Sequence, residues 1–327
     1  MKKLRQLWIL SIMAVFLLAA CGAGEKNNNA SQTTGIETED AAKTDEVQVG
    51  FPITLTDAVG NEITFEKAPE TIVSMMPSNT EILFGLGLND EIVGVNDYDD
   101  YPAEVADKEK IGGLEFNVEK IVSMTPDIVF AHESGLGTGE AGLQQIRDAG
   151  IPVFVVKNAA NFDETYTTIE TIGKATGKSK EAGEIIEGMK AKVEEVLAKT
   201  ASVEQKRSVF VETSPAPEIY TPGKNTFMNQ MLDMIGAENI AADQEGWVMM
   251  EPEEIVKRNP DVIIVMYDYI ETAVEDVYAR DGFDTITAIQ NKAVMQVKEN
   301  ITSRTGPRLA EGLEEIAKAV YPEAFGE

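Results

Sequence analysis

Apolar and polar residues alternate along this chain with two different periods, and each period predicts its own kind of element. Residues 53–65 alternate apolar and polar positions on both sides of Gly60-Asn61, which predicts a β-hairpin. Short apolar runs then occur beside helical or loop segments, at residues 71–76, 92–95, 128–131 and 153–156. Such runs are typical of parallel strands that helices cover on both faces. Residues 51–161 are therefore expected to form an N-terminal α/β lobe.

Between residues 162 and 199, apolar residues recur every three or four positions without a proline, which is the period of a helix. We expect a connecting helix over residues 162–200, with Gly173 and Gly177 breaking it near its start. Strands at 209–211 and 262–266 and helices at 226–235 and 307–319 then predict a C-terminal α/β lobe over residues 201–327. In the first lobe, Ser78 and Glu81 have the spacing of a capping box, which predicts a helix with Ser78 as its N-cap.

An internal repeat relates the two lobes. The segment 119–129 (EKIVSMTPDIV) matches the segment 253–263 (EEIVKRNPDVI). Each segment has the pattern of a helix, a Pro-Asp turn and a buried strand. Shared local patterns produce some similarity of this kind, but one copy in each lobe favours duplication or matched lobes. We expect the lobes to be pseudo-symmetric.

The N-terminus has the pattern of a secretory signal, with basic residues before an apolar run at 7–18 that is shorter than the about 20 residues a membrane span needs. Its ending, Leu18-Ala19-Ala20-Cys21, resembles the bacterial lipobox, in which the cysteine receives a diacylglyceryl group before cleavage. We expect residues 1–20 to be removed and residues 21–50 to form a lipidated, disordered tether. A secreted protein with a chance cysteine is the alternative, but Cys21 is the only cysteine. The expected location is the extracytoplasmic face of the cell membrane, held by lipid alone.

The net charge of −28 argues against binding to nucleic acid or to anionic membrane surfaces, because both depend on Lys and Arg. The acidic residues are spread along the chain, so solubility explains them. One histidine and one cysteine cannot build a multi-histidine zinc site or a Cys/His nucleophile pair. The common hydrolase, P-loop and zinc-protease motifs do not occur in the sequence. We expect no enzymatic activity, no resident cofactor and no resident metal.

Several short segments together resemble one family. They are Thr56-Asp57 with Gly60, Pro77-Ser78-Asn79-Thr80-Glu81, Asp97-Tyr98 with Tyr101-Pro102, the two repeats, Tyr220-Thr221-Pro222-Gly223-Lys224, and Arg304 with Gly306-Pro307-Arg308. In this order, behind a lipobox, they resemble the bilobed substrate-binding proteins of ABC importers for cobalamin, ferric siderophores and haem, over residues 51–325. The resemblance implies a monomer with two Rossmann-like α/β lobes, one long rigid connecting helix, and a ligand cleft between the lobes.

The resemblance also implies roles for individual residues. Glu119 and Glu253, one in each lobe, would dock in basic pockets of the permease dimer that works with an ATPase, unless they are ordinary exposed helix glutamates. The ligand would meet loops at the carboxyl ends of the strands. The residues on these loops are Tyr98, His132, Tyr220, Trp247 and Arg304.

The side chains of this set leave the ligand open. Three aromatic rings suit a bulky ligand, and Arg304 could pair with carboxylate, hydroxamate or catecholate oxygens, while core packing or a surface ion pair are the alternatives. Cobalamin binders carry tryptophans where this chain has Gly113-Leu114 and His132. Cobalamin, a ferric siderophore and haem therefore all stay possible ligands. The rival class is a non-transport surface lipoprotein without a small-molecule ligand.

Overall fold

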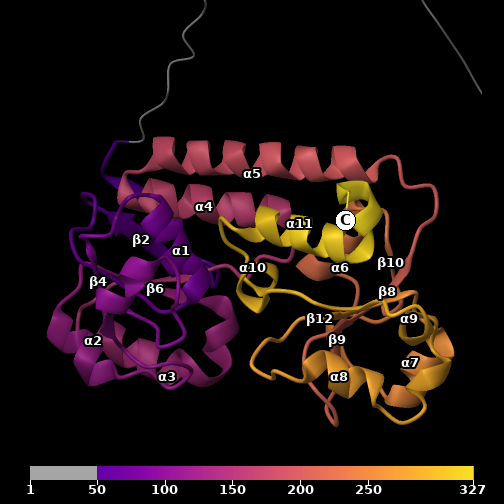
Figure 1. Ribbon diagram of the computed structural model, residues 1–327. Coiled ribbons are helices and arrows are strands. Elements are labelled where there is room, and N and C mark those ends of the chain that lie inside the picture. The colour runs from indigo at the N-terminus through magenta and orange to yellow at the C-terminus, as the bar shows by residue number, and fades with distance from the viewer. Residues whose placement is uncertain (1–49, 327) are drawn as a thin grey trace, which may run out of the picture. The chain divides into compact units, whose positions relative to one another are not determined.

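The computed structural model describes residues 50–326, so Cys21, the predicted signal peptide and almost all of the predicted tether lie outside the described residues. Within the described range, the chain forms two α/β lobes, each with its own parallel sheet (Figure 1). The predicted fold class is thereby confirmed. None of the helices in this range is long and apolar enough to cross a membrane.

The N-terminal lobe contains a five-stranded parallel sheet in the order β5-β4-β3-β6-β7 and the predicted antiparallel hairpin β1–β2. Its strands are β1 Ile53–Thr56, β2 Glu62–Phe65, β3 Ile72–Ser74, β4 Ile92–Val95, β5 Glu109–Lys110, β6 Ile128–His132 and β7 Val153–Val156. Its helices are α1 Pro77–Gly85, α2 Val118–Met124 and α3 Leu136–Asp148, with short 3-10 turns η1 Ala103–Asp107 and η2 Glu133–Gly135.

The C-terminal lobe contains a four-stranded parallel sheet in the order β10-β8-β12-β13 and an antiparallel ribbon of β9 and β11. Its strands are β8 Ser208–Glu212, β9 Tyr220–Pro222, β10 Glu238–Asn239, β11 Trp247–Met249, β12 Val262–Val265 and β13 Val294–Gln296. Its helices are α6 Phe227–Met234, α7 Pro252–Arg258, α8 Ala273–Tyr278, α9 Thr287–Gln290, α10 Glu299–Ser303 and α11 Leu309–Val320, with 3-10 turns η3 Phe283–Thr285 and η4 Pro322–Phe325.

Two helices, α4 Phe162–Thr176 and α5 Ser179–Thr200, connect the lobes. Gly177 ends α4 in the left-handed conformation with φ 72°, as the sequence predicted. The predicted break at Gly173 is wrong, because this glycine lies inside α4. A Cβ there would come within 2.6 Å of the Ala182 Cβ, so Gly173 is where α4 and α5 approach each other closely. In Figure 1, α5 runs along the top from one lobe to the other, and α11 lies beneath it.

One hydrophobic core extends through both lobes. It includes Ile72 and Phe130 from the first sheet, Val209 and Ile264 from the second, and side chains of α5 and α11 between them. Two smaller clusters cover the outer faces of the two sheets. The lobes are therefore held together by shared apolar packing along α5 and α11 as well as by the chain.

The repeat corresponds to matching structure in the two lobes. Helices α2 and α7 both end at a residue in the left-handed conformation, Thr125 (φ 46°) and Asn259 (φ 48°). The aspartates that follow make equivalent bonds to the neighbouring strand: Asp127 Oδ2 accepts from the Thr71 amide at 3.0 Å, and Asp261 Oδ2 accepts from the Ser208 amide at 2.9 Å. The strand orders 4-3-6-7 and 10-8-12-13 also correspond, which confirms the predicted pseudo-symmetry.

The predicted capping box at Ser78 is wrong. Helix α1 begins at Pro77, with Met76 as its N-cap and no side-chain cap, so Ser78 already lies in the first turn. Proline is favoured at the first helical position because its fixed φ suits the helix and its missing N–H would have no partner there. The Glu81 carboxylate does not turn back to the helix start and is instead bonded to arginines of the C-terminal segment.

Candidate functional site

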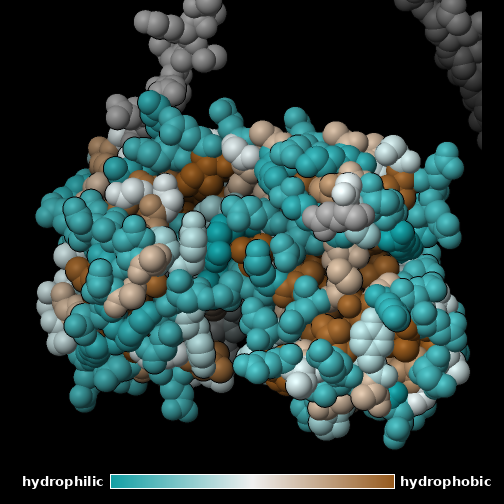
Figure 2. Space-filling model, viewed as in Figure 1, coloured by the Kyte–Doolittle hydropathy of each residue, from teal (hydrophilic) through white to brown (hydrophobic). Residues whose placement is uncertain are grey.

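Most of the exposed large apolar side chains lie on loops and on a ribbon that follow strands of the two parallel sheets, with Val59 on the hairpin and Met295 in β13 as exceptions. Loops at the carboxyl ends of parallel strands are the usual ligand-binding edge of an α/β sheet. In the first lobe this edge carries Tyr98 (61% exposed) and Leu114 (72%), and in the second it carries Tyr269 (65%). Figure 2 shows a notch in the surface between the two lobes. The carboxyl edges of the strands are therefore the candidate site.

A small apolar pocket of about 110 Å³ lies at this edge of the first lobe. Its walls come from the loops after β3, β4, β5 and β6, and Tyr98 and His132 are both part of them. Gly113 lies beneath Tyr98, where a Cβ would approach the exposed tyrosine ring to 2.7 Å and force it to shift. Gly113, which stands where cobalamin binders carry a tryptophan, thus lies beneath the aromatic ring of Tyr98. The pocket lining comprises Met75, Met76, Pro77, Asn96, Tyr98, Gly113, Leu114, Phe116, Ala131, His132, Gly135 and Leu143.

His132 is the last residue of β6 and is buried, with 7% of its surface exposed. Its Nδ1 lies 2.8 Å from Ser134 Oγ and accepts from the Ser134 amide at 3.3 Å, so the ring caps the turn η2. Burial lowers the pKa of the imidazole to about 4, against a weaker opposing effect of Glu133. The side chain is therefore uncharged at neutral pH and contributes a neutral surface to the pocket.

In the second lobe, the β9–β11 ribbon carries a strip of large side chains. Tyr220 pairs with Met249 and Pro222 pairs with Trp247, so Trp247 and Met249 project from the same face of β11. Tyr220, Trp247 and Met249 are 42%, 43% and 51% exposed. The Trp247 ring also packs on Phe227, with ring centroids 5.6 Å apart. The ribbon thus presents two aromatic rings and a thioether on one face, and the Trp247 ring is supported by Phe227.

A buried charged network supports the next loop of this edge. The Glu212 carboxylate is fully buried and accepts from Arg280 Nη1 and Nη2 at 2.7 and 2.8 Å, and from the Tyr267 hydroxyl at 2.8 Å. Tyr267 packs on the exposed Tyr269, with ring centroids 5.5 Å apart. Sequence reasoning missed Tyr269, although two tyrosines directly after a predicted buried strand were a usable signal. The network holds Tyr267 in place, and Tyr269 packs on its ring at the edge of the site.

Arg304 joins the two lobes. Its Nη1 donates to Glu81 Oε1 at 2.9 Å and to Asp100 Oδ1 at 2.6 Å, and its Nη2 donates to the Tyr98 carbonyl at 3.3 Å. Arg308 donates to the same Glu81 carboxylate at 2.9 and 2.6 Å and stacks over Tyr101 at 3.8 Å. The side chain of Arg304 therefore lies at the predicted edge, bonded to the loop that carries Tyr98.

Asp99 lies behind the same loop. Its Oδ2 accepts from Thr80 Oγ1 at 2.8 Å and from the Asn96 amide at 2.9 Å, while Oδ1 is buried without a hydrogen-bond partner among the described residues. Burial raises the pKa of this carboxyl to about 6, although both hydrogen bonds and the charges of Lys110 and Arg304 oppose the rise. Sequence reasoning gave Asp99 no role.

Glu119 and Glu253 occupy equivalent positions, each the second residue of its helix, α2 and α7. Both are exposed, and neither makes an ion pair within residues 50–326. In Figure 1, α2 and α7 lie at the lower side of the two lobes, opposite α5. The two carboxylates thus lie at matched places of the two lobes, clear of the connecting helices.

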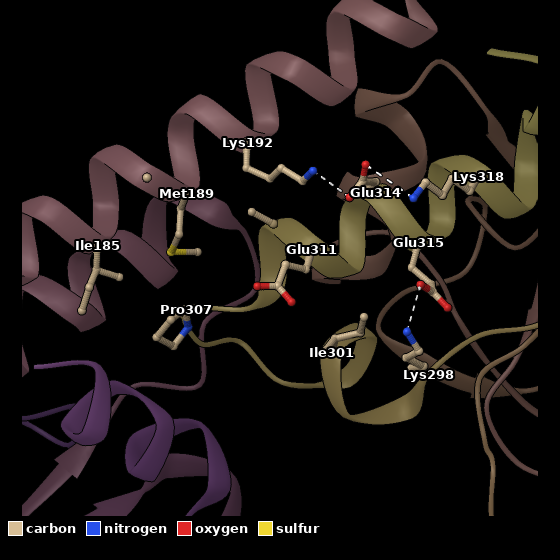
Figure 3. Close-up of a pocket in the computed structure, with 12 residues that line it drawn as sticks. Ile185, Met189, Lys192, Lys298, Ile301, Pro307, Glu311, Glu314, Glu315 and Lys318 are labelled. Atoms are coloured by element: carbon tan, nitrogen blue, oxygen red, sulfur yellow. Dashed lines mark ion pairs between the residues drawn. The ribbon is translucent and has the colours of Figure 1, made fainter. Parts of the chain in front are cut away.

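A larger hollow of about 590 Å³ lies elsewhere, between α5, α10 and α11. Figure 3 shows Lys192 and Lys318 directed at Glu314, and Lys298 directed at Glu315. These charges neutralise one another, and the hollow is formed by packed helices away from the strand edges. No group of three or more His, Cys, Asp or Glu side chains within the described part of the chain is arranged to hold a metal ion. The strand edges therefore stay the better candidate.

Comparisons with known proteins agree with this architecture. Residues 72–301 match the family described as Periplasmic binding protein. The chain is 44% identical over 331 residues, covering 100% of both chains, to the uncharacterized ABC transporter substrate-binding lipoprotein YvrC of Bacillus subtilis. It is 28% identical over 281 residues to a cobalamin-binding protein of Halobacterium salinarum, covering 83% of this chain and 74% of that protein. A crystal structure of a possible iron-binding (periplasmic solute-binding) protein from Staphylococcus epidermidis superposes with a TM-score of 0.72 at 38% identity, covering 78% of this chain and 100% of that one.

Proposed function

The chain belongs to the periplasmic binding protein family, as a substrate-binding component of an ABC transporter, and we propose that its cargo is a bulky metal chelate, cobalamin or a ferric siderophore. Members of this family bind solutes, so the prediction that the chain is not an enzyme is confirmed. We further propose that residues 51–161 and 201–327 act as the two lobes and residues 162–200 as a connector that keeps their spacing nearly constant. Cys21 would carry the lipid that holds the protein at the extracytoplasmic face.

The observation that carries the ligand class is the concentration of exposed aromatic and thioether side chains on facing strand edges. Tyr98 and Leu114 come from one lobe, and Tyr220, Trp247 and Met249 come from the other. Each exposed aromatic side chain leaves apolar area in water that a large ligand would cover, at about 25 cal/mol per Å². A small ion has no apolar surface to place on this arrangement, whereas a large organic chelate can cover several of these side chains at once. His132 would contact the ligand as a neutral group.

Similar proteins support the same ligand class. One relative is named a cobalamin-binding protein, and the superposed structure is described as possibly iron-binding. Both names fit a metal held inside a large organic chelate. The described residues give no cluster that would hold a bare metal ion.

In this proposal, Arg304 acts mainly on the protein and not on the ligand. Because its guanidinium is bonded to Glu81 and Asp100, it would position the Tyr98 loop and would meet the ligand only at its edge. The charged atoms of a ligand would have to displace Asp100 before they could reach it.

To deliver its ligand, the protein needs a second surface that contacts the permease. We propose that Glu119 and Glu253 pair with arginines at equivalent places of the two permease subunits, since matched carboxylates on two pseudo-symmetric lobes suit a twofold partner. Uptake in cells lacking the protein should be restored by the wild type and lost with the double variant Glu119→Arg/Glu253→Arg, which should still bind ligand. Glu187→Arg, an exposed change on α5, should restore uptake. Full uptake by the double variant would contradict the docking role.

A direct test uses the protein from residue 22 onward, in which Trp247 is the only tryptophan. Its fluorescence would be titrated with cyanocobalamin, ferrioxamine B, a ferric tricatecholate and haemin. We expect saturable quenching by cyanocobalamin or ferrioxamine B, and calorimetry should show weaker binding by the Trp247→Ala variant. Leu114→Ala should also weaken binding, whereas Val59→Ala, an exposed apolar residue on the hairpin, should not. Tight binding of haemin alone would favour the haem alternative, and no binding would favour a surface lipoprotein without a small-molecule ligand.

A further inference from the structure

The charged side chains around the strand edges restrict the class of chelate that this site would bind. We propose that the site selects metal chelates that are uncharged or cationic and disfavours chelates that carry carboxylates or other net negative charge. This inference rests on the proposed function, because it names the charge class of ligand for the same strand edges. It is carried by the placement of the charged side chains named below, on or beside those edges.

The cationic side chains on or beside these loops are already bonded within the protein. Arg304 is bonded to Glu81 and Asp100, Arg280 to Glu212, Lys157 to Glu164 at 3.0 Å, Lys224 to Glu245 at 3.2 Å, and Lys298 lies 3.9 Å from Glu315. Lys110 donates to the carbonyls of Asn96 and Asp99 at 3.2 and 2.9 Å. Within residues 50–326, each of these cationic side chains therefore faces a carboxylate or a carbonyl of the protein, closely for the arginines and Lys110 and more loosely for the exposed Lys157, Lys224 and Lys298.

The carboxylates at the same edges are not all neutralised. Arg304 and Arg308 balance Glu81 and Asp100, two charges against two. Glu299 lies at the start of α10, and burial raises the pKa of its carboxyl; the charges of Asp268 and Asp100 add to this rise, and the charge of Arg304 opposes it. The charge of Glu299 also acts on Tyr269, the exposed ring of the C-terminal edge.

Asp268 adds to this negative charge. It is exposed, and it directly follows the buried Tyr267 of the supporting network and precedes Tyr269. Asp97, next to the exposed Tyr98, is likewise exposed, and within residues 50–326 its carboxylate accepts from the Gly112 amide alone, at 3.0 Å. The aromatic rings that would cover the ligand are thus bordered on both lobes by carboxylates that form no ion pair within the described residues, although the charge of Arg304 acts on Glu299.

A ligand that fits such a surface places uncharged or positively charged atoms against it. An added carboxylate on the ligand would be repelled by Glu299 and Asp268. Like charges about 8 Å apart weaken binding by roughly twofold in bulk water and by roughly 30-fold at the effective dielectric constant of about 20 near a protein surface, so an effect of about fivefold is an intermediate expectation. The penalty should shrink in about 0.5 M salt, because exposed charges are screened over a few ångströms there. An amide or an ammonium group at the same position carries no such penalty.

Two series of probes separate charge from shape. The first is ferrioxamine B, whose pendant ammonium is positive, with its N-acetyl derivative, which is neutral, and its N-succinyl derivative, which is negative. The second is cyanocobalamin and its monocarboxylate, in which one side-chain amide is hydrolysed. Within each series the metal centre is unchanged. Calorimetry with the protein from residue 22 onward would give each Kd at low and high salt.

We expect the carboxylate member of the series that binds to have a Kd about fivefold or more above its neutral member. The double variant Glu299→Gln/Asp268→Asn should reduce that ratio to about one, whereas Glu184→Gln/Glu187→Gln, which removes two exposed charges from α5, should leave it unchanged. Carboxylate probes that bind as tightly as neutral ones in the wild type would overturn the charge inference and leave the proposed function standing. Absence of binding in both series, with tight binding of the ferric tricatecholate, would overturn the charge inference alone, because that chelate is a ferric siderophore of net negative charge. Absence of binding by every cobalamin and siderophore probe would overturn the proposed function, and the inference with it.

Discussion

Two buried titratable groups behind the first-lobe edge should make opposite contributions to the pH dependence of stability. Asp99 has a folded pKa of about 6, raised by burial from 3.8, and His132 has a folded pKa of about 4, lowered by burial from 6.5. Stability follows the difference in bound protons between the unfolded and the folded state. Replacing either group should therefore reveal a pH dependence of the free energy of unfolding that is nearly absent in the wild type, where the two contributions oppose each other.

The signs follow from which state holds the proton. Between about pH 4 and 6, folded Asp99 keeps a proton that unfolded Asp99 releases, so this group stabilises the fold as the pH falls. Between about pH 4 and 6.5, unfolded His132 binds a proton that the folded ring does not, so this group destabilises the fold as the pH falls. Each difference of about two in pKa corresponds to roughly 3 kcal/mol at most. In the wild type the two contributions nearly cancel.

The suitable variants are Asp99→Asn and His132→Asn. Asparagine keeps an acceptor for Thr80 and the Asn96 amide at the first position, and its amide oxygen matches the Nδ1 that caps Ser134 at the second. The free energy of unfolding, from urea titrations at pH 4 to 7.5, should fall by about 3 kcal/mol in Asp99→Asn relative to the wild type as the pH is lowered. As the pH is lowered, the free energy of unfolding of His132→Asn should rise by a similar amount relative to the wild type.

A second measurement checks the cause. Since the chain has a single histidine, one imidazole resonance in the proton NMR spectrum reports its pKa directly. The double variant should have the same pH profile as the wild type, offset by a constant. If Asp99→Asn and the wild type have parallel profiles, or if the histidine titrates near 6.5, burial does not control these groups and the reasoning is refuted.

Three further predictions concern stability. Arg280→Ala should lower the free energy of unfolding by about 3–5 kcal/mol in urea titrations, because it leaves the fully buried Glu212 carboxylate without its counter-charge. Asp261→Ala should cost about 1–2 kcal/mol by the same measurement, since the Ser208 amide and hydroxyl lose their acceptor; an unchanged midpoint would count against the matched-turn description. Gly312→Ala should reduce the melting temperature by several degrees, because its Cβ would overlap the Ile301 carbonyl, while Gly183→Ala, in open space on α5, should hold or raise it.

Much of the fold could be predicted because its signals are local. The apolar runs at β4, β6 and β7 and the alternating hairpin were located from period alone, and the repeat correctly indicated matched lobes. Gly177 was a reliable helix end because a left-handed residue there strongly favours glycine. Gly173 was misread, since its reason is a neighbouring helix that the sequence does not place. Ser78 and Glu81 were misread for a similar reason: Glu81 is bonded to arginines more than two hundred residues away.

The site was predictable only in outline. The exposed Tyr98, Tyr220 and Trp247 lie at strand edges because the order of strands and loops puts them there, and that order is written in the sequence. The bonding of Arg304 depends on how the last segment of the chain packs across the first lobe, which no local pattern reports. The roles of Asp99 and Glu212 depend on burial, so neither residue type nor spacing could have indicated them.

The bonds from Glu81 to Arg304 and Arg308 have a consequence for the order in which a newly made chain can fold. A chain that leaves the secretion machinery N-terminus first exposes α1 and the whole first sheet before residues 304–308 emerge. Until then, Glu81 lacks the two guanidinium groups that its carboxylate accepts from in the finished fold. Helix α11 and the turn η4, whose side chains complete the shared core, emerge at the very end. The first lobe is therefore expected to gain its last ion pairs and part of its core only when the end of the chain arrives.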